Sequence, residues 1–97
     1  DMLYLITYDV ETVSPAGRKR LRQVAKLCQN YGQRVQNSVF ECLLDEVSLI
    51  RLKHAISDII DKTADSVRFY NLGKNWNRRV DMIGRITSFN MEEELII

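Results

Sequence analysis

The stretch Leu3-Tyr4-Leu5-Ile6-Thr7-Tyr8-Asp9-Val10 decides how the rest of the chain is organised. Its aliphatic, aromatic and β-branched side chains predict a strand over residues 3–10, and the nearly continuous apolar run is typical of a central strand. Asp9 is the only charged residue of the stretch. We therefore expect one carboxylate at the end of a central strand.

Two helices are predicted after this strand. Ser14-Pro15 is a helix-start pair, and apolar residues then recur every three or four positions up to about Tyr31. Gly32 is expected to end this helix at the C′ position. A second amphipathic pattern predicts a helix from residue 45 or 48 to about residue 62.

Extended segments are expected at 33–36, 38–44 and 67–72, with a further short strand at 80–83. The order β-α-β-β-α-β plus an extra strand indicates an α+β, ferredoxin-like fold with an antiparallel sheet. Both helices then cover one face, and a second copy of the chain is the expected cover for the other. We expect one domain over 1–97, divided into a core (about 2–73), a loop with the extra strand (74–85) and a tail (86–97).

Composition excludes several classes of protein. The chain has 97 residues and a net charge of +1, and no apolar run reaches the length of a membrane span. We find no secretory signal pattern, and Cys28 and Cys42 form neither a CxxC pair nor a metal-binding cluster. A cytoplasmic protein with two reduced core thiols is the expectation.

Asp9 is the first candidate for chemistry. At a strand end, a carboxylate is a ligand for Mg²⁺ or Mn²⁺ or, alternatively, a turn residue that accepts hydrogen bonds from the following loop. One carboxylate makes a poor metal site. A two-fold dimer whose axis passes near the strand end would bring two Asp9 carboxylates together, so the metal hypothesis depends on a dimer.

Basic residues are the second candidate, because no acidic residue lies between Thr12 and Phe40. Such a stretch favours binding to a phosphate backbone, with a solvated helix face as the alternative. Trp76 and its basic neighbours are either a nucleic-acid contact or part of a core or dimer interface. The predicted nucleic-acid-binding residues are Arg18, Lys19, Arg20, Arg22, Lys26, Arg34, Arg78 and Arg79.

Three segments together resemble the Cas2 family of CRISPR-associated proteins. They are the strand 3–10 ending in Tyr8-Asp9, the basic helix start 17–22, and the segment 31–41 with its Gln36-Asn37-Ser38-Val39-Phe40 sequence. The resemblance extends from Met2 to about Arg85. It implies a ferredoxin-like homodimer in which the strand 80–83 extends the sheet of the partner.

The resemblance also implies a function. Asp9 matches the metal-linked catalytic residue of an endonuclease dependent on Mg²⁺ or Mn²⁺, with Tyr8, Ser38 and Phe40 as supporting residues and Arg34 nearby. The implied substrates are double-stranded DNA or single-stranded RNA, and the implied partner is the CRISPR integrase of spacer acquisition. The alternatives are a non-catalytic DNA-binding scaffold that bridges integrase dimers and a toxin-like messenger RNA nuclease. The acidic and apolar tail 91–97 is either a frayed end or a strand that docks the integrase.

Overall fold

β1 (Met2–Asp9) is a central strand of the sheet, as the opening stretch predicts. The computed structural model describes residues 1–84 and places β1 between two antiparallel neighbours. The sheet order is β2-β3-β1-β4. The other elements are α1 (Pro15–Gln29), β2 (Gly32–Gln36), β3 (Val39–Leu44), α2 (Glu46–Ile59), β4 (Ser66–Gly73) and the short 3₁₀ helix η1 (Trp76–Arg78). The predicted ferredoxin-like fold is confirmed.

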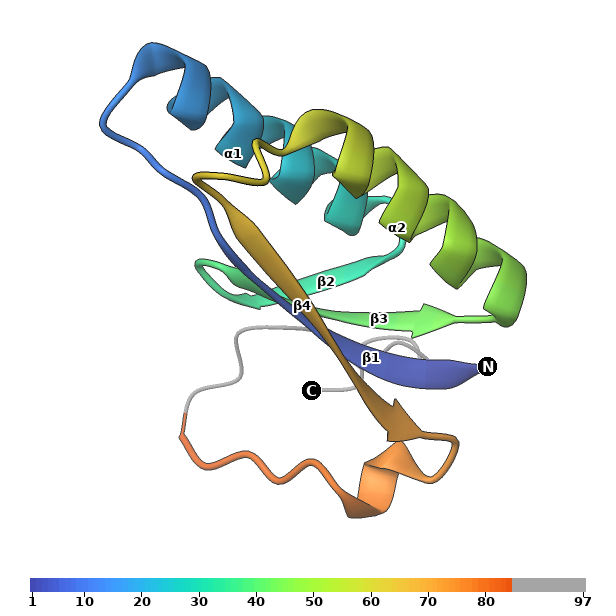
Figure 1. Cartoon of the computed structure of the whole chain (residues 1–97). Coiled ribbons are helices and arrows are strands. Elements are labelled where there is room, and N and C mark those ends of the chain that lie inside the picture. The colour runs from blue at the N-terminus through green and yellow to red at the C-terminus, as the bar shows by residue number, and fades with distance from the viewer. Residues whose placement is uncertain (85–97) are drawn as a thin grey trace.

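Both helices lie on one face of the sheet (Figure 1). Alternate residues of β1 (Tyr4, Ile6 and Tyr8) are buried on that face, since successive side chains of a strand point to opposite sides. They form one core with Phe40 of β3 and with residues of both helices. Each fully buried large apolar side chain in such a core contributes roughly 1.5–3 kcal/mol, which makes this layer the main source of stability.

The helix starts agree with the sequence, and the end of α1 does not. The Ser14 side chain accepts a hydrogen bond from the amide of Gly17, and Asp45 caps α2 in the same way through Ser48. The prediction that Gly32 ends the first helix is wrong, because α1 ends at Gln29 and Gly32 opens β2 without a positive φ. A Cβ on Gly32 would overlap the backbone of Glu41 and Cys42, so close packing against β3 explains this glycine.

Neither α-helix lies on the second face of the sheet (Figure 1). Leu5, Val39 and Leu43 share it and are half-buried, and the segment after β4 runs beneath it (Figure 1). Residues 80–83 form no strand within the described chain, so their pairing with a second copy stays a prediction. The tail expected at 86–97 lies outside the described residues. No helix within residues 1–84 is long and apolar enough to cross a membrane.

Candidate metal and nucleic-acid site

Asp9 is exposed at the last position of β1. Its side chain points to the same face of the sheet as the other odd-numbered residues of β1. We call this face, which neither α-helix covers, the helix-free face. Asp9 pairs there with Ser66 of β4. The side chain lines a shallow depression of about 400 Å³. The other residues that line the depression are Thr7, Tyr8, Ser38, Val39, Ser66, Arg68 and Tyr70.

The hydrogen bonds expected of a turn carboxylate are made by a different residue. Glu11 accepts from the Ser14 amide at 2.6 Å and from the Ser14 hydroxyl at 2.8 Å, and these bonds lower the pKa of Glu11. The Asp9 carboxylate has no hydrogen bond or ion pair within residues 1–84. Asp9 is therefore an exposed carboxylate whose oxygens remain available to a ligand.

The chemistry of the depression fits half of a site for a hard cation. Mg²⁺ and Mn²⁺ prefer oxygen donors, and the depression offers the Asp9 carboxylate together with the hydroxyls of Ser38 and Ser66. Among residues 1–84, however, no group of three or more His, Cys, Asp or Glu side chains could hold a metal ion. A single described chain thus supplies one carboxylate, and a complete site needs ligands from elsewhere.

Tyr8 connects the β2–β3 turn to the end of β1 through two hydrogen bonds. Its backbone amide donates to the Ser38 carbonyl at 3.1 Å, and its hydroxyl donates to the Asn37 carbonyl at 3.3 Å. The ring stacks on Phe40 with centroids 6.0 Å apart, and burial raises the pKa of the hydroxyl. Tyr8 and Phe40 therefore belong to the core beneath the site, whereas Ser38 is placed at its rim.

A second depression of about 520 Å³ lies between α1 and the β2–β3 turn. We call it the basic groove, and its cationic side chains are Arg22, Lys26 and Arg34. The Arg34 guanidinium also stands over the Phe40 ring, 5.3 Å from its centroid. Tyr8 and Ser38 line both the groove, on the α1 side of the sheet, and the Asp9 depression, on the opposite side, so both hollows border the end of β1.

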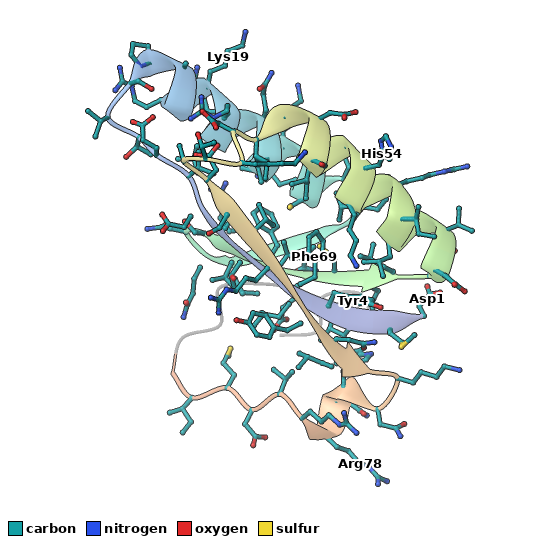
Figure 2. The ribbon with its side chains drawn as sticks, viewed as in Figure 1. Asp1, Tyr4, Lys19, His54, Phe69 and Arg78 are labelled. Carbon is teal, nitrogen blue, oxygen red and sulfur yellow. The ribbon has the colours of Figure 1, made fainter. Side chains whose placement is uncertain are left out.

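The remaining predicted basic residues are not gathered in this groove. Lys19 and Arg78 lie at opposite ends of the molecule in Figure 2. Arg18 donates to the carbonyls of Thr12 and Val13, and Arg79 donates to the carbonyl of Leu72.

Arg20 is bonded to Asp65 and has a further ion pair with Glu11 at 3.6 Å. Its side chain is 17% exposed, so its guanidinium is less accessible than those of its neighbours in the basic stretch. The structure thus brings together three of the eight predicted residues.

Comparison with known proteins identifies the family. The family model described as "CRISPR associated protein Cas2" matches residues 2–80. The chain belongs to the Cas2 family. It is 56% identical over 95 residues to the CRISPR-associated endonuclease Cas2 of Halalkalibacterium halodurans, covering 98% of this chain and 99% of that protein. It is 54% identical to the CRISPR-associated endoribonuclease Cas2 3 of Rhodospirillum rubrum, covering 98% and 100%.

Solved Cas2 structures share the fold. The crystal structure of Streptococcus pyogenes Cas2 at pH 6.5 superposes with a TM-score of 0.77 and 61% identity, over 86% of this chain and 100% of that one. A chain of a partial Cas6-RT-Cas1–Cas2 complex superposes with a TM-score of 0.65 and 32% identity, over 86% and 85%. The resemblance drawn from three sequence segments is confirmed.

The structure adds three side chains from β4 to the site of this chain that sequence reasoning missed. Ser66, Arg68 and Tyr70 line the Asp9 depression. Alternation along β4 places all three residues on one face of the strand. This alternation points to the site only when the β1–β4 register is known, because the register pairs Thr7 with Arg68 and Asp9 with Ser66.

Proposed function

We propose that this protein is a homodimeric, metal-dependent endonuclease that hydrolyses phosphodiester bonds of DNA or RNA in CRISPR spacer acquisition. One observation carries the proposal: an exposed Asp9 carboxylate without a protein partner in the described chain stands where the basic groove meets the end of β1. Two relatives that match nearly the whole chain bear the names endonuclease and endoribonuclease.

The dimer is part of the proposal because Asp9 supplies half of a cation site. In a two-fold dimer each carboxylate has a symmetry mate, and two carboxylates plus waters suffice for Mg²⁺ or Mn²⁺. When bound, such an ion supplies an activated water and neutralises charge on the phosphate. The helix-free face, which carries Asp9 and half-buried Leu5, Val39 and Leu43, is the surface that we expect the second copy to cover.

The basic groove would hold the nucleic-acid backbone. Arg22 and Lys26 are exposed on one side of α1, and Arg34 faces them from β2. No carboxylate of the described chain lines the groove, so these cations are available to phosphates. The shared border at Tyr8 and Ser38 would let one strand occupy both the groove and the Asp9 depression.

The test is a comparison of wild type with Asp9→Asn. We expect Mg²⁺-dependent cleavage of DNA or RNA by the wild type, loss of that cleavage in the variant, and unchanged binding of the same nucleic acid in EDTA. The Asp58→Asn variant, which removes an exposed carboxylate from α2, is the matched control and should cleave normally. Equal cleavage by purified wild type and Asp9→Asn would rule out the catalytic role of Asp9.

A second function is favoured by the groove itself, which needs no metal. In this alternative the protein is a DNA-binding scaffold that bridges two dimers of the integrase. The structural neighbour found in a complex with Cas1 supports this alternative. It predicts that Asp9→Asn still supports spacer acquisition in cells, whereas reversing Arg22 and Lys26 to glutamate abolishes both DNA binding and acquisition. Loss of acquisition in Asp9→Asn cells, at normal protein levels, would favour the nuclease.

A further inference from the structure

Arg68 stands in the Asp9 depression, and the metal and groove described above leave it without a role. We propose that Arg68 is a catalytic residue that binds the scissile phosphodiester group and stabilises the negative charge on its non-bridging oxygens during hydrolysis. The inference rests on the proposed nuclease function. It names a group of this chain that would neutralise the phosphate in addition to the cation held at Asp9.

The register of the sheet places Arg68 beside Asp9. Arg68 of β4 is directly opposite Thr7 of β1, and Asp9 is two residues further along β1 on the same face. Such diagonal neighbours have Cβ atoms about 7 Å apart, within reach of a long side chain. The two side chains therefore border one depression from adjacent strands.

The guanidinium of Arg68 is available for a ligand. None of the ion pairs within residues 1–84 involves Arg68, although Asp9 lies in the same depression. Its Nη1 donates to the Tyr70 hydroxyl at 3.2 Å, which raises the pKa of Arg68. Arg68 is exposed, and its Nε and Nη2 donors remain without a partner in the described chain. These donors form the planar fork that suits a phosphate.

A phosphate would fit between the two side chains, because Asp9 and Arg68 border one depression. A cation held by Asp9 would take oxygen ligands, and a non-bridging phosphate oxygen is such a ligand. A second non-bridging oxygen of the same phosphate would then accept hydrogen bonds from the Arg68 fork.

A guanidinium held at this position would raise the rate of hydrolysis because of the way in which charge changes during the reaction. Hydrolysis forms a bond between phosphorus and the oxygen of a water molecule and breaks the bond from phosphorus to one sugar oxygen. The water gives up a proton, and the leaving oxygen takes one up. Charge on the non-bridging oxygens rises in the transition state, where a preorganised donor has most effect. Tyr70 supplies preorganisation by holding one arm of the guanidinium.

Arg68→Gln is the decisive variant, with Arg68→Lys as the conservative one. Arg51→Gln is the matched control, because it removes an exposed arginine from α2, outside both hollows. Three quantities are measured for each: the single-turnover cleavage rate with Mg²⁺, the Kd for the same nucleic acid in EDTA, and the Kd for Mn²⁺ by electron paramagnetic resonance. Asp9→Asn is measured in parallel.

We expect Arg68→Gln to lower the cleavage rate about 10²–10³-fold, the loss typical of one transition-state donor. The nucleic-acid Kd should rise less than about threefold, and Mn²⁺ should bind as tightly as to the wild type or more tightly. Arg68→Lys should restore part of the rate, since it keeps the charge and loses the fork. A Mn²⁺ site that stays intact while the rate falls distinguishes this role from a general structural defect.

A rate within threefold of wild type in Arg68→Gln would overturn the inference, and so would an equal loss of rate and of Mn²⁺ affinity. If Arg68→Gln does not fold, Arg68→Lys decides, because an unchanged rate would show that the fork is not needed. If Asp9→Asn cleaves like wild type, the proposed nuclease function fails together with this inference. Loss of cleavage in Asp9→Asn with full cleavage in Arg68→Gln would refute the role of Arg68 alone.

Discussion

Arg20 donates a hydrogen bond from Nε to Oδ2 of Asp65 at 2.7 Å, across 45 positions of sequence. The Asp65 side chain is completely buried, and it also accepts from the backbone amides of Glu11 and Asp61. Glu11 follows Asp9 by two residues, and Ser66, which follows Asp65, pairs with Asp9. The Arg20–Asp65 pair therefore ties together the two chain segments that flank Asp9.

The first prediction concerns acid stability. The hydrogen bond from Arg20 is the main reason that the pKa of Asp65 is below its usual value. A depressed carboxyl pKa stabilises the fold above the unfolded-state pKa, and this contribution is lost as the pH falls through the folded-state pKa. Asp65→Asn should therefore lower the free energy of unfolding by about 3 kcal/mol at pH 7, and by less at pH 3.

Urea unfolding at the two pH values checks this prediction. Asp58→Asn is the control, because that carboxylate is exposed. Its ion-pair partner, the exposed His54 of α2, has its Nδ1 atom 3.7 Å from Oδ2 of Asp58. Asp58→Asn should change stability little at either pH. If Asp65→Asn lowered the free energy of unfolding equally at pH 7 and pH 3, the ionised Asp65 carboxylate would not be the stabilising form.

The second prediction concerns the thiols. Cys28 and Cys42 are fully buried, and burial raises their pKa values to about 11 and about 12. Because the thiolate is the reactive form, neither should react with a disulfide reagent in the folded protein at pH 8. Both should react within seconds in 6 M guanidinium chloride. Rapid labelling of a native thiol would show that the core around α1 and β3 opens readily.

The third prediction concerns the basic groove. Replacing Arg22 or Lys26 with glutamine should weaken duplex binding and reduce the slope of log K against log salt by about 0.9 for each phosphate that is no longer neutralised. Fluorescence anisotropy at several salt concentrations measures the slope. Arg51→Gln on α2 should leave the slope unchanged. If the groove variants retain the wild-type slope, the nucleic acid is bound elsewhere.

The fourth prediction follows from the packing of Gly32. Its missing side chain lets β2 approach the backbone of β3 at Glu41 and Cys42. Gly32→Ala should destabilise the fold by about 1–3 kcal/mol through overpacking. Gln36→Ala, at an exposed position of the same strand, should have little effect in the same thermal melts. A stable Gly32→Ala variant would show that the hairpin can shift without cost.

Local patterns were enough to predict the elements and the place of Asp9. The apolar run 3–10 predicted the central strand, and the Ser14-Pro15 pair predicted the start of α1, because both signals lie within a few residues. The role predicted for Gly32 was wrong because it depends on a contact outside its own segment. The backbone that Gly32 approaches belongs to β3. A glycine needed for close approach and one needed for a positive φ look alike in sequence.

The composition of the candidate site depended on contacts that no local pattern contains. Arg20 looked free because no acid lies near it in sequence, and its partner Asp65 comes from the loop before β4. Arg68 was missed because its nearness to Asp9 follows from the β1–β4 register alone. Sequence reasoning thus found the cations of the basic groove, which come from the one basic stretch 12–40, and it missed Arg68 and Tyr70 of the Asp9 depression, which the sheet brings close to Asp9.

The central claim, that Asp9 is half of a metal site completed by a second chain, is tested most directly by counting bound metal ions. Mn²⁺ titration of the dimer, followed by electron paramagnetic resonance, should give one tightly bound ion for every two chains. Asp9→Asn should abolish this binding while the dimer remains intact by analytical ultracentrifugation. One tight ion per chain, or unchanged Mn²⁺ binding in Asp9→Asn, would contradict a site shared by two Asp9 carboxylates.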